Sequence, residues 1–193
     1  MAGDHEQVEV KSRGELRAWL AAHHMQSNSI WLVTWKKHTP HHVSWDEVVE
    51  EALCFGWIDS QPRKLDADRT MLRLSPRKPG SGWSGVNKAR IERLSVAGLM
   101  APPGLAKIEQ ARRDGSWEAL DGASSLDVPP DLEATFARYP GAAERFAGFP
   151  PSARRAILEW IGLAKRGQTR AERIEKTAEL AQKGERANQW PRR

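Results

Sequence analysis

The spacing of apolar residues changes along this chain, and the change constrains the fold more than any other feature. Residues 29–37 are rich in β-branched and aromatic residues, and residues 61–75 carry the pattern of a hairpin, both of which are typical of strands. From residue 127 onward, apolar residues recur at the three- and four-residue intervals of helices. This order predicts the α+β class: a small antiparallel or mixed sheet with a β-hairpin, covered by helices and followed by a helical C-terminal region.

Two segments carry the strand pattern. Residues 29–37 predict a strand whose alternation places two sets of side chains on opposite faces: Ile30, Leu32 and Thr34, and Trp31, Val33 and Trp35. Residues 61–75 predict a hairpin in which Leu72 and Leu74 point inward and Arg73 points to the opposite face. These strands form the predicted sheet.

Three Ser/Thr-x-x-Glu sequences mark predicted helix starts. They begin at Ser12, Ser44 and Thr169, and in each the hydroxyl and the carboxylate can satisfy backbone amides reciprocally. The second precedes a helix that starts with Trp45 and ends near Gly56. We therefore expect one helix before the first strand, one between that strand and the hairpin, and one near the C-terminus.

A Gly/Ser-rich segment followed by two prolines is the best domain boundary in the chain. It separates a predicted α+β domain, residues 1–122, which carries a Trp- and Arg-rich motif, from a predicted helical region, residues 127–193. A chain of 193 residues can bury such a core without disulfides, and its single cysteine cannot form an internal bridge.

Basic residues are concentrated in two zones. Residues 60–93 hold nine Lys or Arg against three acids, and residues 151–193 hold eleven against five, while the net charge of the whole chain is +5. Such zones suggest a phosphate, a carboxylate or nucleic acid as partner, although solvated helix faces produce similar runs. The first residues lack the pattern of a secretory signal and no apolar run has membrane-spanning length, so we expect a cytoplasmic protein with no membrane contact.

The stretch from Phe55 to Asn87 holds the strongest candidate site. It combines indoles, guanidinium groups, a carboxylate and hydroxyls in a segment too polar for a core and unusually rich in Trp. Arginine forks recognise planar oxyanions, indole faces hold cations or rings, and Ser and Asn supply neutral hydrogen bonds. The ligand-binding residues that we predict are Trp57, Asp59, Arg63, Arg73, Arg77, Trp83, Ser84 and Asn87.

We expect these residues to hold a small anionic or amide-bearing ligand. The arginines would bind oxyanions, Asp59 would orient an arginine or accept from a ligand nitrogen, the two indoles would wall the pocket, and Asn87 would fix the register of the ligand. Free helix amides near Ser84 would favour an anion. An alternative is a structural Asp–Arg network with Trp57 and Trp83 in the core.

The Trp- and Arg-rich motif is similar to that of the YdeI/OmpD-associated family, whose members are often labelled bacteriocin-protection proteins. The resemblance runs from about Ser12 to Gly184 and is carried by residues 52–60 (ALCFGWIDS), 75–77 (SPR), 81–87 (SGWSGVN) and 164–174 (AKRGQTRAERI). It implies a fold and a site, and a role in protection against an antimicrobial or a stress.

Two other functions stay open from the sequence. In one, the same constellation is an enzyme with Asp59 as the candidate catalytic base and the arginines stabilising developing negative charge. In the other, the two basic zones bind nucleic acid, which is less favoured because no helix-turn-helix, zinc or RNA-binding signature is present. The chain also lacks a Gly-rich phosphate loop, a nucleophile elbow and an HExxH motif, so no cofactor is predicted.

Cysteine and histidine are expected to stay outside the chemistry. Cys54 falls on a predicted helix between Leu53 and Phe55, which is typical of a buried, unreactive thiol. The histidines in the loop after the first strand have no recognised ligand spacing and no completing carboxylate or cysteine, so no metal site is predicted at His38, His41 and His42.

Overall fold

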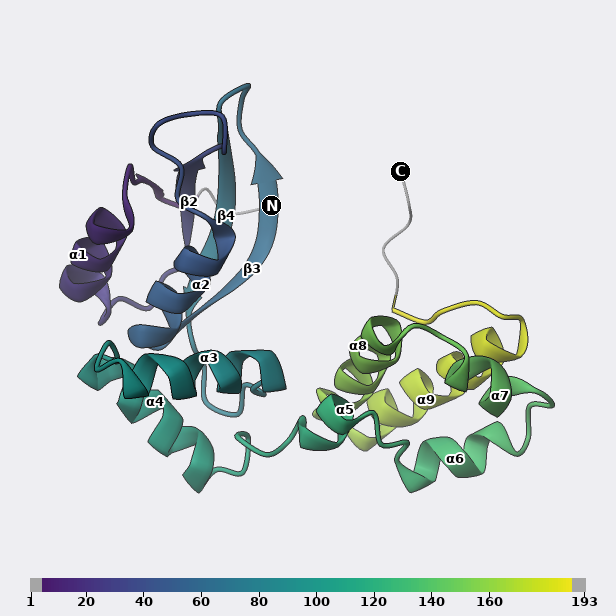
Figure 1. Ribbon diagram of the computed structural model, residues 1–193. Helices are drawn as coiled ribbons and strands as arrows, with labels where there is room; N and C mark the ends of the chain where they lie inside the picture. The colour runs from purple at the N-terminus through teal and green to yellow at the C-terminus, as the bar shows by residue number, and fades with distance from the viewer. Residues whose placement is uncertain (1–4, 189–193) are drawn as a thin grey trace. The chain divides into compact units, whose positions relative to one another are not determined.

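The computed structural model describes residues 5–188 (Figure 1). In these residues it contains a four-stranded mixed sheet and nine helices, which confirms the predicted α+β class. The chain forms two compact units. The N-terminal unit comprises the chain up to residue 81 together with residues 86–114, and the C-terminal unit comprises residues 82–85 and those from 115 onward.

The sheet belongs to the N-terminal unit, and its strands lie in the order β1-β2-β4-β3. The strands are β1 (Gln7–Glu9), β2 (Ile30–Trp35), β3 (Trp57–Lys64) and β4 (Arg69–Pro76). The predicted strand and hairpin are both present. The short β1 was not predicted; it pairs parallel to β2, whereas β2 and β3 both pair antiparallel to β4.

The register of β2 and β4 gives the sheet two chemically different faces. Leu32 lies opposite Leu72 and Ile30 opposite Leu74, and all four are buried; we call this the leucine face. Because neighbouring residues of a strand point to opposite sides, the other face carries Trp31, Val33 and Trp35 of β2 with Arg69, Met71 and Arg73 of β4, and Arg63 of β3. We call this second surface the Trp/Arg face.

A β-bulge in β3 brings Asp59 onto the leucine face beside Pro62. Asp59 lies opposite Leu74 and Pro62 opposite Leu72, so three steps along β3 match two steps along β4. The extra residue lets two positions separated by an odd number of residues point to the same side. The carboxylate of Asp59 therefore faces the helices rather than the Trp/Arg face.

Four helices accompany the sheet: α1 (Arg13–His23), α2 (Trp45–Cys54), α3 (Gly85–Val96) and α4 (Pro102–Arg113). The predicted capping residues Ser12 and Ser44 begin the first two. Ser44 forms the complete capping box with Glu47, whereas at α1 the carboxylate of Glu15 accepts from the backbone N–H of Lys11 instead. α4 approaches α2 closely at Gly104, where an added Cβ would lie 2.2 Å from the carbonyl oxygen of Cys54.

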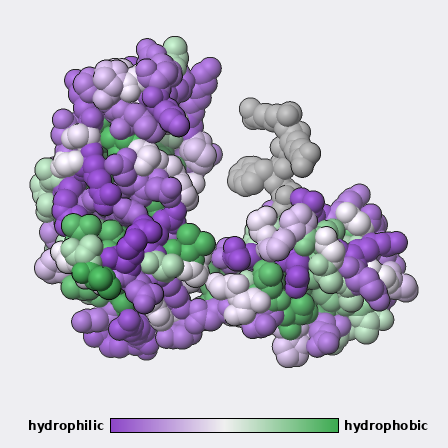
Figure 2. Space-filling view, viewed as in Figure 1, coloured by the Kyte–Doolittle hydropathy of each residue, from purple (hydrophilic) through white to green (hydrophobic). Residues whose placement is uncertain are grey.

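The surface of the N-terminal unit separates polar from apolar regions. Its exposed large apolar residues include Val86 on α3, Leu105 on α4, and Val96 and Leu99 at and after the end of α3. Figure 2 shows hydrophobic patches over this part of the unit and a mostly hydrophilic surface near the turn between β3 and β4.

The C-terminal unit is helical, with α5 (Asp121–Ser125), α6 (Pro130–Phe136), α7 (Ala142–Ala147), α8 (Pro151–Gly162) and α9 (Gly167–Gln182). Its core includes Leu132, Phe146 and Ile157, each at most 1 % exposed. The predicted capping box at Thr169 was wrong. α9 already begins at Gly167, and its first residue is preceded by Arg166, which makes no side-chain capping bond.

Candidate functional site

The predicted site residues are divided between the two units. Trp83 and Ser84 belong to the C-terminal unit. The N-terminal unit holds Trp57, Asp59, Arg63, Arg73, Arg77 and Asn87. Each part is therefore described within its own unit.

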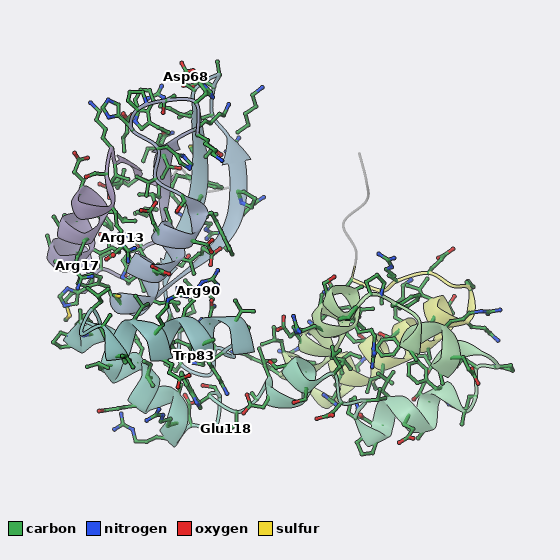
Figure 3. The ribbon with its side chains drawn as sticks, in the orientation of Figure 1. Arg13, Arg17, Asp68, Trp83, Arg90 and Glu118 are labelled. Atoms are coloured by element: carbon green, nitrogen blue, oxygen red, sulfur yellow. The ribbon has the colours of Figure 1, made fainter. Side chains whose placement is uncertain are left out.

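Both predicted wall residues are buried. Trp57, the first residue of β3, is 0 % exposed, and its ring meets that of Trp19 edge-on at 5.8 Å between centroids. Trp83 is 1 % exposed, and its ring lies 5.2 Å from that of Trp117 (Figure 3 labels Trp83). These indoles contribute to the cores of their units, and their contact with a ligand stays a prediction.

The sheet separates two of the predicted arginines from Asp59. Arg63 and Arg73 lie on the Trp/Arg face, where the guanidinium of Arg63 is 5.8 Å from the ring centroid of Trp31. Nη2 of Arg73 donates to the hydroxyl of Ser29 at 3.4 Å. Because Asp59 lies on the leucine face, the structure does not bring these two guanidinium groups to its carboxylate.

Arg77 is the predicted arginine whose charge interacts with that of Asp59. It follows β4, is 3 % exposed, and its backbone N–H donates to the carbonyl of Gly56 at 2.9 Å. Burial lowers the pKa of Arg77 to about 10, and the negative charge of Asp59 opposes this shift. The guanidinium is therefore still charged at neutral pH, and Asp59 offsets part of the cost of burying it.

Asp59 also holds an exposed indole that the sequence did not single out. Nε1 of Trp45 donates to Oδ2 of Asp59 at 3.2 Å, and the guanidinium of Arg90 lies 5.1 Å from the Trp45 ring centroid. Arg90 in turn donates to Asp46 at 2.5 Å and to Asn87 at 3.2 Å, and Figure 3 shows Arg90 between α3 and α2. Two predicted site residues thus hold Trp45 in position: Asp59 bonds to it directly, and Asn87 acts through Arg90.

Trp45 lines a pocket of about 280 Å³ on the leucine face, which we call the Trp45 pocket. The pocket lies where α2 meets β2, β3 and β4. Its apolar part on the leucine face is formed by Val43, Trp45, Val48, Pro62 and Leu72, with two threonines, Thr34 and Thr70, beside them. Trp35 and Met71, which belong to the Trp/Arg face, also border the pocket. This geometry is typical of small-molecule sites, which are mostly apolar with a few polar groups.

Two lysines, Lys36 and Lys37, and one histidine, His42, line the Trp45 pocket, and none of its described lining residues is acidic. Nζ of Lys36 donates to the carbonyls of Asp66 and Ala67, both at 2.7 Å, which positions the amine without neutralising its charge. His42, one of the three histidines in the loop after β2, thus borders a cavity, and its Nδ1 lies 2.9 Å from the carbonyl oxygen of Trp35.

Trp45 was not among the predicted site residues, because its position in the apolar series of α2 indicated a residue packed in the helix interface. Trp45 is nevertheless 55 % exposed. It is the first residue of the helix, directly after the capping serine, where a side chain can lie beyond the packed stripe. A large aromatic residue at that position was the available signal.

Cys54 lies beside a buried ionic network rather than in a reactive site. Glu51 is 2 % exposed and accepts from Arg13 at 2.7 Å and from Arg17 at 2.9 Å; both arginines project from α1 (Figure 3). Burial raises the pKa of the fully buried Cys54 thiol, and the charge of Glu51 adds to this rise. A raised pKa disfavours the nucleophilic thiolate, as expected for a structural cysteine.

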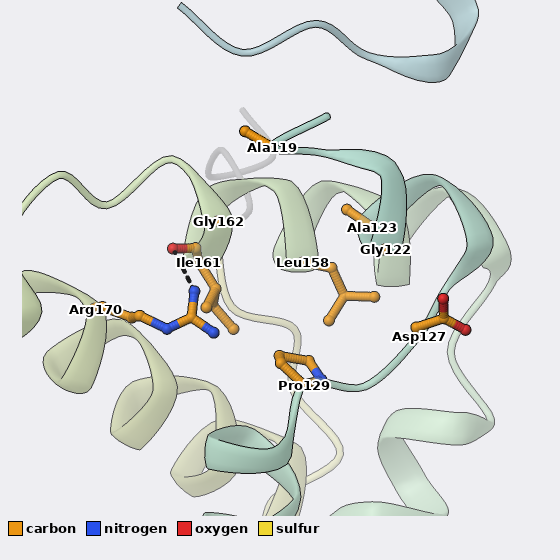
Figure 4. A pocket seen from close by; sticks show the side chains of 9 residues that line it. All are labelled: Ala119, Gly122, Ala123, Asp127, Pro129, Leu158, Ile161, Gly162 and Arg170. Carbon is orange, nitrogen blue, oxygen red and sulfur yellow. Dashed lines mark hydrogen bonds between the residues drawn. The ribbon is translucent and has the colours of Figure 1, made fainter. Parts of the chain in front are cut away.

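The C-terminal unit has a smaller pocket of about 140 Å³ near the end of α8 (Figure 4). Arg170 reaches its edge, and Nη1 of Arg170 donates to the carbonyl of Ile161 at 3.5 Å. The same guanidinium pairs with Asp131 through Nε at 2.6 Å and Nη2 at 2.9 Å, which lowers the pKa of Asp131. The bidentate pair ties α9 to α6 and occupies most of the donors of Arg170.

Within residues 5–188, no group of three or more His, Cys, Asp or Glu side chains is arranged to hold a metal ion. In the same part of the chain, no helix combines the length and the apolar character needed to cross a bilayer.

Comparison with known families assigns different descriptions to the two parts of the chain. Residues 8–107 match a family model described as a domain of unknown function, DUF8412. Residues 125–184 match the model described as Bacteriocin-protection, YdeI or OmpD-Associated, which confirms the resemblance for the C-terminal part, whereas the motif of residues 52–87 lies within the first match. Searches of curated proteins and of solved structures found nothing that matches the chain.

Proposed function

This chain belongs to the DUF8412 family, whose model covers just over half of it, and from that premise we propose that its N-terminal unit binds a small planar anion in the Trp45 pocket. The proposal keeps the anionic ligand expected from the sequence. It gives Asp59 and Asn87 the task of fixing Trp45 and Arg90, which form one side of the site.

The observation that carries the proposal is an exposed indole beside basic side chains. Trp45 lines the pocket together with Lys36, Lys37 and His42. An aromatic or otherwise planar body would pack on this indole, and its anionic group would be attracted by the lysines. A cationic ligand would find no carboxylate among the described lining residues.

The size of the pocket limits the ligand. At about 280 Å³ it lies near the lower end of small-molecule sites, which are roughly 300–1,000 Å³. A single aromatic ring with one carboxylate is the scale of molecule that such a volume holds. A nucleotide or a peptide would extend well beyond it.

Trp45 is held in place before any ligand arrives. Its N–H is bonded to Asp59, and one cation, Arg90, lies against the ring, while more than half of the side chain is exposed. A wall that is already ordered loses little conformational freedom on binding, and this favours affinity.

Thermal-shift and fluorescence titration with benzoate test the proposal, with uncharged benzamide as the matched probe. We expect benzoate to raise the melting temperature and benzamide to have little effect. In Trp45→Ala, benzoate binding should weaken about tenfold, because aromatic pairs contribute about 0.5–1.5 kcal/mol beyond area burial. Lys37→Gln should weaken benzoate without affecting benzamide.

Trp31→Ala is the control, since Trp31 lies on the opposite face of the sheet. It removes the same kind of side chain from the same unit and should leave benzoate binding unchanged. Equal binding of benzoate and benzamide, or equal loss in Trp31→Ala and Trp45→Ala, would contradict the proposal.

A further inference from the structure

We propose that the Trp/Arg face is a second binding surface, which takes single-stranded nucleic acid. Bases would stack beside Trp31 and Trp35, and the phosphates would lie near Arg63 and Arg73. Its central residues, Trp31, Arg63 and Arg73, point away from the leucine face and do not line the Trp45 pocket, which this surface meets only at Trp35 and Met71.

The aromatic part of this surface is a strip along β2. Trp31 and Trp35 are half-buried, so part of each ring is accessible. They point to the same side and are four residues apart, which corresponds to about 13 Å along a strand. Val33 and Met71, 2 % and 5 % exposed, form a packed floor between them. Two indoles over such a floor make a platform long enough for neighbouring unstacked bases.

Guanidinium groups accompany both rings. Arg63 lies 5.8 Å from the ring centroid of Trp31, and Arg69 lies 5.6 Å from that of Trp35. Arg73 is the direct cross-strand partner of Trp31. Guanidinium planes can stack on bases as well as on indoles and can still donate to phosphate oxygens through their edges.

The charge on this face is unevenly neutralised, and the difference points to an anionic partner. Arg69 pairs with Glu9 at 2.7 Å and with Asp66 at 2.8 Å. In the described part of the chain, by contrast, neither Arg63 nor Arg73 forms an ion pair with a carboxylate. The uncompensated positive charge is therefore concentrated around Trp31, where it complements phosphate.

A polar pocket continues the surface beyond Trp31. It has a volume of about 160 Å³ and is lined by His5, Glu6, Gln26, Asn28 and Ser29. Ser29 connects it to the strip, since its hydroxyl accepts from Arg73 and lies 2.8 Å from that of Ser75. Amide, imidazole and hydroxyl groups suit sugar hydroxyls and base edges. The carboxylate of Glu6 would repel phosphate, which places the phosphates on the side of Arg63.

These features favour a single strand over a duplex. Base faces are accessible to indoles only when the bases are unpaired and unstacked from their own strand. Two unpaired arginines also supply few of the phosphate contacts on which duplex binding depends. We therefore expect a short contact of a few nucleotides, sequence-tolerant, with moderate salt dependence.

Fluorescence anisotropy with a labelled oligothymidylate, and with the same strand annealed to its complement, tests the proposal on the full chain. We expect the single strand to bind more tightly than the duplex, with quenching of Trp fluorescence. Trp31→Ala should weaken binding about tenfold and Trp31→Phe much less, because stacking of one base contributes about 1–3 kcal/mol. With two phosphate contacts, the slope of log affinity against log salt should be about −1.4, falling to about −0.7 in Arg63→Gln.

Trp45→Ala and the double variant Lys165→Gln/Arg166→Gln are the controls, and both should bind the oligothymidylate as the unaltered chain does. The first belongs to the Trp45 pocket and the second to the basic C-terminal zone. The proposal is overturned if the single strand does not bind at about 50 mM salt, if the duplex binds equally well, or if the C-terminal variant loses binding while Trp31→Ala retains it. Benzoate binding is measured separately, so either proposal can fail alone.

Discussion

The two faces of one sheet differ: helices cover one of them, and the other leaves two indoles and their neighbouring arginines partly accessible. The leucine face carries Leu32 and Leu74, both 0 % exposed, beneath helices. The Trp/Arg face, formed by the alternate residues of the same strands, carries half-buried indoles beside arginines. The difference teaches that alternation along a strand decides which face a residue joins, while the helices decide whether that face becomes core or surface.

The largest effect should come from the buried ions that attach α1 to α2 above the leucine face. In Glu51→Gln, Arg13 and Arg17 lose the charge of a partner that is only 2 % exposed. Breaking a fully buried pair from one side costs about 3–5 kcal/mol. Because Arg13 and Arg17 are themselves 32 % and 36 % exposed, we expect the lower end of this range. Urea unfolding should show this loss, whereas Glu50→Gln, which removes a more exposed carboxylate from the same helix, should cost clearly less.

A comparison of two substitutions on neighbouring positions of β4 tests the contrast itself. Leu74→Ala should cost about 2–5 kcal/mol, because it empties a fully buried site on the leucine face. Arg73→Gln, on the other face, should change the free energy of unfolding by less than about 1 kcal/mol. If both substitutions lower the free energy of unfolding equally, the Trp/Arg face is packed as tightly as the leucine face, and the contrast between the two faces is wrong.

Alternation explains why much of this contrast could be predicted from the sequence. The period of two between residues 29 and 37 assigned Leu32 and Trp31 to opposite faces, and the register confirms it. The α+β class and the capping residues of α1 and α2 were predictable for the same reason, since both depend on local spacing. At α9 the local signal misled: Thr169 lies inside a helix that starts two residues earlier.

The candidate site was less predictable because it depends on contacts between distant segments. The bulge after Asp59 has no clear signature in the sequence, yet it places Arg63 on the side of the sheet opposite to this carboxylate, which meets Trp45 instead. Proximity along the chain had suggested that these arginines and Asp59 would converge. A one-residue shift in a strand is enough to send neighbouring charges to opposite sides.

A moderate effect is expected from Asp59 itself. Asp59→Ala removes the acceptor of the Trp45 N–H, a hydrogen bond that contributes about 0.5–1.5 kcal/mol. Benzoate affinity should therefore fall about two- to tenfold, while affinity for oligothymidylate stays unchanged. Asp59→Asn keeps an acceptor oxygen and should retain most of the benzoate affinity. A loss of oligothymidylate binding in Asp59→Ala would show that the two faces are coupled.

The smallest effect concerns the start of α2, the helix that covers the leucine face. The hydrogen bonds from the hydroxyl and the backbone N–H of Ser44 lower the pKa of Glu47 below its usual 4.5. Because the folded-state pKa is the lower one, this stabilisation is present above pH 4.5 and is lost as the pH falls through the folded value. Glu47→Gln should therefore cost about 0.5–1 kcal/mol at pH 7, within the range of helix caps.

The same substitution should cost progressively less as the pH is lowered below 4.5, because Glu47 in the unaltered chain is then protonated as well. Urea unfolding at neutral and acidic pH measures this difference. Since Trp45 directly follows the cap, benzoate affinity should fall slightly in Glu47→Gln, whereas the accessible indoles of the Trp/Arg face should be unaffected. A pH-independent cost would mean that the carboxylate stabilises α2 by packing and not by its charge.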